Sequence, residues 1–162
     1  MVDDMKFFKY SDYSSVVNNI FILLKNEIES HLPMAYIEHI GSSSIKGAIS
    51  KGDLDVLVVV EKTNFDDSLE RIKSLGYIEK KNTLRTDSLC MLITDKYDYD
   101  VAIQLVVNGR EQESFVRFRN LLGARPLLLE EYNKLKMSSI DLTEDEYRLR
   151  KSKYIQKVLS GE

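Results

Sequence analysis

The sequence is poor in four residue types: it has one cysteine, two prolines, two histidines and no tryptophan in 162 residues. With Cys90 alone, no disulfide can form within the chain, which is the cysteine usage expected in a reducing cytoplasm. Apolar runs such as residues 56–60 are far shorter than the ~20 residues that a membrane-spanning helix needs. We therefore expect a cytoplasmic protein with no membrane partner.

An excess of positive charge is also absent, because the formal net charge is -3. A nucleic-acid partner is therefore not expected from the overall charge, although a local basic patch is compatible with it. Apolar residues make up 43% and charged residues 30%, as in ordinary globular proteins. The sequence shows no internal repeat and no linker rich in proline, glycine or serine, so we expect one domain over residues 1–162. Its oligomeric state is left open.

Hydrophobic periodicity alternates between the two regular types along the chain. The expected strands cover residues 35–40, 54–60, 77–81, 88–94 and 99–107, and the expected helices cover residues 13–31, 64–75, 111–123, 126–140 and 143–159. Pro126 suits a first helical turn, and Thr143 with Glu146 has the form of a capping box. The predicted fold class is α+β, a mixed sheet with helices packed on it and a C-terminal helical tail over about residues 111–160.

Two carboxylates stand one residue apart where the strand of residues 54–60 begins. Residues i and i+2 of a strand point to the same face, so Asp53 and Asp55 project together, roughly 6.6 Å apart along the chain. Carboxylate oxygens are the ligands that Mg²⁺ prefers, and Mg²⁺ completes its shell with water and substrate phosphate. The pair therefore predicts a site for Mg²⁺ or Mn²⁺.

A third carboxylate opens the strand of residues 99–107. Alternation places Asp98, Asp100 and Gln104 on one face, and Asp100, nearest the buried part, is the predicted third ligand, with Asp98 second. Three carboxylates would allow two metal ions about 3.5–4 Å apart. The alternative interpretation is that these aspartates are solubilising charges or turn formers at strand ends.

The stretch GSSS, residues 41–44, precedes the carboxylates by about ten positions. Gly41 would let the backbone approach a ligand closely, and Ser42 and Ser43 offer hydroxyls at a helix start, where phosphate binds. Lys51 could neutralise phosphate charge or bind the carboxylates; a solvated lysine is the alternative. A phosphate-binding stretch followed by metal-binding carboxylates is what a nucleoside triphosphate requires.

With these motifs the sequence resembles the nucleotidyltransferase fold of polymerase β type and, within it, the GrpB family. The resemblance covers about residues 7–160 and rests on IEHIGSSSIKG, on Lys51 before the aspartate strand, on LGY at residues 75–77 and on FVRFRNLLGARPLLLEEYNKLK in the tail. GrpB proteins typically keep only the later strand aspartate, Asp55 here, and often carry a histidine where this chain has Gln104. No established substrate comes with the family.

The resemblance implies a metal-dependent transfer of a nucleoside monophosphate from a nucleoside triphosphate to an unknown acceptor. Asp53, Asp55 and Asp100 would be the catalytic and metal-binding residues, while Gly41, Ser42, Ser43 and Lys51 would bind the nucleotide phosphates. Two alternatives stay open: a nucleotide-binding or regulatory module without turnover, and an antitoxin-like partner of another protein. The roles of Arg85, Arg117, Arg119 and His39 are also left open.

Overall fold

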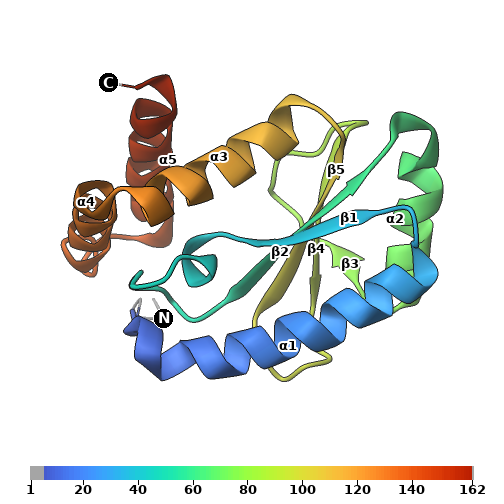
Figure 1. The fold of residues 1–162 in the computed structure, drawn as a ribbon, viewed down its shortest axis with the longest axis horizontal. Coiled ribbons are helices and arrows are strands. Elements are labelled where there is room, and N and C mark those ends of the chain that lie inside the picture. Colours follow the sequence, from blue (N-terminus) through green and yellow to red (C-terminus); the bar gives the residue numbers. More distant parts are fainter. Residues whose placement is uncertain (1–5, 162) are drawn as a thin grey trace.

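The computed structural model describes residues 6–161, except for the side chains of residues 110 and 111, and shows a mixed sheet with helices on both faces (Figure 1). The strands are β1 (Tyr36–Ile40), β2 (Leu54–Val60), β3 (Ile78–Glu79), β4 (Leu89–Thr94) and β5 (Val101–Val107). The helices are α1 (Tyr10–His31), α2 (Phe65–Ser74), α3 (Arg110–Ala124), α4 (Pro126–Met137) and α5 (Glu144–Ser160), with short 3₁₀ turns η1 (Ser42–Ser44) and η2 (Lys62–Asn64).

The strand order is β1-β2-β5-β4-β3. β2 and β5 are parallel neighbours, and the other adjacent pairs are antiparallel. β2 and β5 lie inside the sheet, which explains their near-continuous β-branched and aliphatic sequences LDVLVVV and VAIQLVV. The register pairs Asp55 with Ala102 and Leu57 with Gln104, so these four side chains point to the same face.

Helices α1 and α2 cover the opposite face of the sheet. Their apolar stripes, for example Val17, Leu24 and Ile28 of α1, pack on the alternate residues of β2, including Val56 and Val58. These side chains are buried, and together they form the main hydrophobic core. Burial at about 25 cal/mol per Å² of apolar surface makes this layer the principal source of stability.

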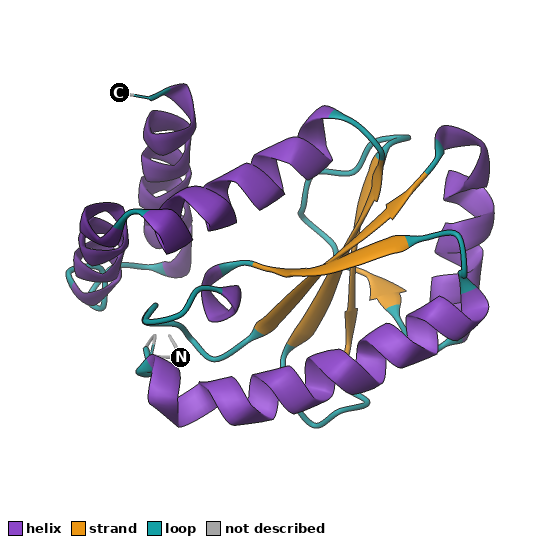
Figure 2. Ribbon diagram, viewed as in Figure 1, coloured by secondary structure: helices purple, strands orange, loops and turns teal. Residues whose placement is uncertain are grey.

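The face that carries Asp55 is only partly covered. Phe115 and Val116 of α3 pack over the far ends of the central strands, on a cluster that includes Leu57 and Val59. Helices α3, α4 and α5 then form a separate apolar cluster with the segment after η1, through Ile45. Figure 2 shows α4 and α5 standing beside the sheet, with α3 running toward them from the end of β5.

The α+β class and all five predicted strands and five predicted helices are confirmed, with shifts at their ends. The capping box is confirmed in its main contact, because the Glu146 backbone N–H donates to Thr143 Oγ1 at 3.2 Å. The predicted start of the last strand is wrong: β5 begins at Val101, and Asp98 lies in a turn with a φ of 52°. No helix within residues 6–161 has the length and apolar character to span a bilayer.

Candidate functional site

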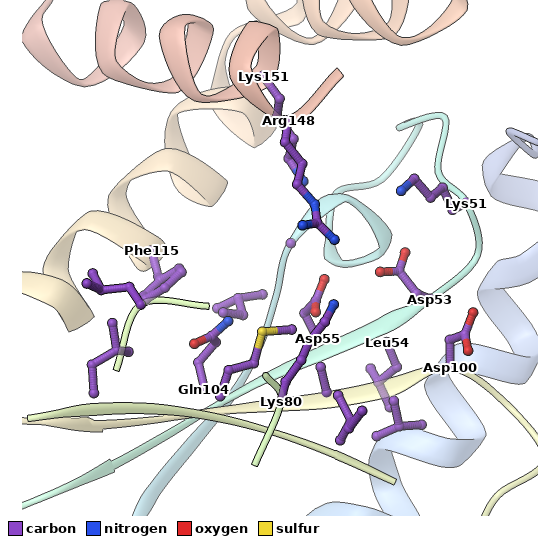
Figure 3. A pocket seen from close by; sticks show the side chains of 18 of the residues that line it. Lys51, Asp53, Leu54, Asp55, Lys80, Asp100, Gln104, Phe115, Arg148 and Lys151 are labelled. Carbon is purple, nitrogen blue, oxygen red and sulfur yellow. The ribbon is translucent and has the colours of Figure 1, made fainter. Parts of the chain in front are cut away.

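A cavity of about 1270 Å³ lies between the uncovered face of the sheet and helices α3 and α5. This exceeds the ~300–1,000 Å³ of common ligand sites. One end is polar and contains Gly41, the predicted carboxylates and several cationic side chains. The charged residues are Lys51, Asp53, Asp55, Lys80, Asp100, Arg148 and Lys151. Much of the remaining lining is apolar and comes from β4, β5 and the helices, and Figure 3 shows Gln104 and Phe115 on the other side of Asp55 from Lys51 and Asp53. The cavity therefore has two chemically different halves.

Asp53 and Asp55 stand side by side in the polar half, as the alternation of β2 predicts. Asp53 is the residue before the strand, and Asp55 is its second residue. Figure 3 shows both carboxylates rising from the strand into the cavity (Figure 3). Burial, and then the charge of Asp53, raise the pKa of Asp55 to about 7, while Lys151, Lys80 and Lys51 oppose this rise. Such a pair costs free energy unless a cation neutralises it.

Gly41 lies against the Asp55 carboxylate at the end of β1. The end of β1 pairs with β2 so that Ile40 lies opposite Asp55, and Gly41 follows directly. A Cβ on Gly41 would stand 2.6 Å from Asp55 Oδ2, and the Gly41 backbone has φ 75° and ψ -175°, a conformation almost restricted to glycine. The Gly41 backbone therefore lies close to the Asp55 carboxylate, and its approach to a ligand phosphate stays a prediction.

Asp100 lines the same cavity but lies to one side of the pair. It precedes β5, and its backbone carbonyl accepts a hydrogen bond from the Leu54 N–H at 2.9 Å. Its carboxylate is exposed and stands beside Leu54 in Figure 3. Within the described part of the chain, no three acidic, histidine or cysteine side chains lie close enough to hold a metal ion together. The structure thus brings two of the three predicted ligands together and leaves Asp100 apart.

The serines of the GSSS stretch are turned toward the protein and do not line the cavity. The buried Ser43 Oγ lies 2.9 Å from His39 Nε2, and Ser42 Oγ lies 3.4 Å from the Tyr132 hydroxyl. Ser44, which was not a candidate, donates to the Gly41 carbonyl at 2.6 Å. These contacts fix the turn that carries Gly41. In this arrangement, Gly41 lines the cavity and the three serines do not.

Lys51 lines the cavity, where its ammonium group contacts residues of α5. Its Nζ lies 3.3 Å from Glu144 Oε1 and 5.3 Å from the centre of the Tyr147 ring. Glu144 also lies 3.7 Å from Arg148 Nη2. One exposed carboxylate therefore places two cations beside the aspartate pair.

Sequence reasoning missed the cations of α5, Arg148 and Lys151, and also Lys80 after β3. Figure 3 shows the side chains of Arg148 and Lys151 reaching down from α5 toward Asp53 and Asp55. The hydroxyl of Tyr132, then Tyr147 and the two aspartates, raise the pKa of Lys151 above its ordinary value against the effect of burial. The basic run YRLRKSKY at residues 147–154, with spacing i to i+3 between the two cations, was the available signal.

The remaining open residues make contacts within the protein. Arg85 Nε lies 2.8 Å from Glu79 Oε1, and its guanidinium stands over the ring of Phe65. Arg119 Nη1 lies 2.7 Å from Glu38 Oε2 and donates to the His39 carbonyl at 2.9 Å. Neither Arg85 nor Arg119 lines the large cavity.

His39 and Arg117 complete this set. Burial, with a smaller effect of the Arg119 charge, lowers the pKa of His39 to about 4. The His39 ring stacks on Phe21 with centroids 5.3 Å apart. Arg117 is exposed and lines a separate small hollow on α3. His39 thus acts as a neutral, packed side chain behind the GSSS turn.

The family model described as GrpB protein matches residues 9–160. A UPF0157 protein of Vibrio cholerae serotype O1 is 45% identical over 157 residues, which are 97% of this chain and 83% of the relative. The crystal structure of conserved protein GrpB from Enterococcus faecalis superposes with a TM-score of 0.69 at 18% identity, over 95% of this chain and 99% of that one.

The fold is also similar to that of a protein that is not described as GrpB. The Cid1 poly(U) polymerase, in a structure with MgGTP bound, matches with a TM-score of 0.53 and 14% identity, over 75% of this chain and 41% of that chain. At such identities the two solved structures bear on the fold alone. The fold is nucleotidyltransferase-like, and the described cavity lies on the carboxylate-bearing face of its sheet.

Proposed function

The chain belongs to the GrpB family, and we propose that it binds a nucleoside triphosphate with Mg²⁺ or Mn²⁺ and transfers the nucleoside monophosphate to an acceptor. One observation carries the proposal: the carboxylates of Asp53 and Asp55 share a large cavity with the cations of Lys51, Arg148 and Lys151. A metal–triphosphate complex has both charges, so this pairing suits it. The nucleotidyltransferase-like fold supports the same conclusion.

The donor set fits a hard divalent cation. Asp53 and Asp55 offer adjacent carboxylates, and burial together with mutual repulsion has raised the pKa of Asp55 to about 7. Both residues would hold Mg²⁺ or Mn²⁺, which keeps part of its shell for water and phosphate oxygen. The bound ion would supply neutralisation of triphosphate charge. Asp100 lies apart from this pair among the described residues and is not part of the donor set.

The protein's own cations are placed to hold the phosphates. Lys51, Arg148 and Lys151 would contact phosphate oxygens by charge-assisted hydrogen bonds. An acceptor oxygen or nitrogen would then attack the α-phosphorus, and the bond to the bridging oxygen of the β-phosphate would break. Pyrophosphate leaves, and the acceptor's proton goes to a base, for which Asp100 is exposed at the edge of the cavity. Catalysis of this type depends on positioning and charge neutralisation.

A second candidate function is nucleotide binding without turnover. It is favoured by the separation of Asp100 from the Asp53–Asp55 pair in the described residues and by Ala102, which lies opposite Asp55 on β5. The two functions differ in product, not in binding. A transferase releases pyrophosphate when a suitable acceptor is present, whereas a binding module releases none.

The test follows pyrophosphate release from each of the four nucleoside triphosphates with Mg²⁺ or Mn²⁺. Candidate acceptors are a polyol mixture, an amine mixture and the protein itself. Asp55→Asn is the inactive variant, and Asp141→Asn, an exposed position outside the cavity, is the matched control. Release lost in Asp55→Asn alone supports the transferase, whereas binding without release by the wild type supports the second candidate. A wild-type protein that binds no triphosphate and releases no pyrophosphate would refute both candidate functions.

A further inference from the structure

The apolar half of the cavity contains a carboxamide that the proposed chemistry does not use. The amide of Gln104 rises from β5 into the cavity, on the side of Phe115 of α3 (Figure 3). Gln104 is half-buried and lines the cavity. Aliphatic and aromatic side chains line the same cavity: Leu84, Leu89, Met91, Ile93, Phe115 and Phe118. A polar side chain placed in such walls is available to bind a ligand.

The position of Gln104 relative to the carboxylates is set by the sheet. Asp55 pairs with Ala102, and Gln104 lies two residues further along the same face of β5. The offset is roughly 7 Å along the strands, a distance that one ribose can bridge. Met91 of β4 is the direct partner of Gln104 on its other side. A group attached to a ribose whose phosphates lie at Asp55 would therefore reach Gln104.

We propose that the apolar half is a nucleobase subsite, in which Gln104 binds the N6 and N7 edge of an adenine. This inference rests on the proposed function. A base has two apolar faces and a polar edge, and the cavity offers Met91 and Phe115 as apolar walls with one amide among them. Thioether and aromatic groups both pack well on a planar ring. An apolar acceptor would use the walls and leave the amide unpaired.

The amide selects among bases by its donor and acceptor. A glutamine side chain offers one N–H donor beside one carbonyl acceptor, which matches the N6 amino group and N7 of adenine. Guanine presents two acceptors, N7 and O6, along the same edge, so one amide group would face a like partner. The cavity is therefore expected to prefer ATP over GTP as the donor nucleotide.

The experiment measures the affinities of ATP, GTP, CTP and UTP by calorimetry with Mg²⁺ for wild type, Gln104→Leu and Gln104→Glu. Gln104→Leu is expected to weaken ATP binding about ten- to hundredfold, the loss of a bidentate pair, and to change GTP binding less than about twofold. Gln104→Glu removes the donor and should also weaken ATP while favouring CTP, whose N4 amino group donates to carboxylates. Gln156→Leu, on the exposed side of α5, is the matched control.

The outcomes separate this inference from the proposed function. An equal loss for all four triphosphates in Gln104→Leu, or no loss of ATP affinity, would overturn the adenine subsite and leave the metal–triphosphate site standing. Wild-type protein that binds no triphosphate would overturn both. Melting curves of the two Gln104 variants show whether a loss of affinity comes from a loss of fold.

Discussion

Gly41 is in direct contact with Asp55: the position of its missing Cβ lies 2.6 Å from Asp55 Oδ2. The turn at the end of β1 and the carboxylate on β2 are thereby coupled, and neither can change without the other. The contact explains why a glycine stands before the serines. The contact also predicts an interaction between the two residues that a double-mutant cycle of unfolding free energies can measure.

We predict that Gly41→Ala destabilises the protein by about 1–3 kcal/mol, because its backbone lies in a region that only glycine adopts easily and its Cβ meets the carboxylate. Asp55→Ala in the same chain removes the steric part of this cost. Urea denaturation of both single variants and the double variant forms a cycle in which the double variant should lose less than the two singles combined. Strict additivity would show that Gly41 and Asp55 do not interact.

The second prediction concerns pH and Asp55 in metal-free protein with a chelator present. Its pKa is about 7 in the folded chain and near the ordinary 3.8 when unfolded, so between these values the native state holds a proton that the unfolded state releases. Stability therefore falls as pH rises from about 4 to 7, and the loss is complete above 7. Asp55→Asn should flatten this slope and stabilise the protein at pH 8 by about 1–3 kcal/mol.

Melting temperatures of wild type and Asp55→Asn between pH 4 and 8 measure this effect. Asp141→Asn, at an exposed turn outside the cavity, is the control and should leave the wild-type slope in place. An unchanged slope in Asp55→Asn would mean that its carboxyl group is not the one that titrates.

The third prediction concerns His39, whose pKa is lowered from 6.5 to about 4 by burial and by Arg119. Because the unfolded state takes up the proton first, stability is lost as pH falls from 6.5 to 4, by at most about 1.4 kcal/mol per pH unit. His39→Gln should remove this part of the acid slope. His31→Gln, on the exposed end of α1, should not. The account of His39 fails if both variants behave alike in acid denaturation.

The fourth prediction concerns the cations of α5. Lys151→Met should weaken triphosphate binding at least about tenfold, since a charge-assisted hydrogen bond contributes roughly 1.5–3 kcal/mol. The salt dependence of the affinity should also become shallower. Lys153→Met, on the same helix but exposed and outside the cavity, is the matched control. Equal affinities of the two variants would place the phosphates elsewhere.

Much of the fold and part of the site could be predicted from the sequence. The period of two placed Asp53 and Asp55 on one face, because alternation is a local property of a strand. The β-branched run of β2 also predicted a strand that is buried on both faces. Local patterns of this kind do not depend on how distant segments meet.

What could not be predicted depends on contacts between distant segments. The side chains of Ser42 and Ser43 turn toward Tyr132 and His39, and only the packing of α4 and the stacking of His39 decide this. The turn at Asp98 shortens β5 through a positive φ that no periodicity reveals. The cations of α5 reach the carboxylates across about a hundred residues of chain, a distance over which sequence patterns carry no register.

A thermal-shift screen of the four nucleoside triphosphates, with and without Mg²⁺ or Mn²⁺, on wild type and Asp55→Asn decides whether the cavity binds a metal–triphosphate complex. Ligand binding to the folded state raises Tm, by mass action. If the cavity binds a metal–triphosphate complex, Tm rises only when triphosphate and metal are both present, and this rise is lost in Asp55→Asn. A rise that persists without metal or in Asp55→Asn, or no rise for any triphosphate, would contradict it.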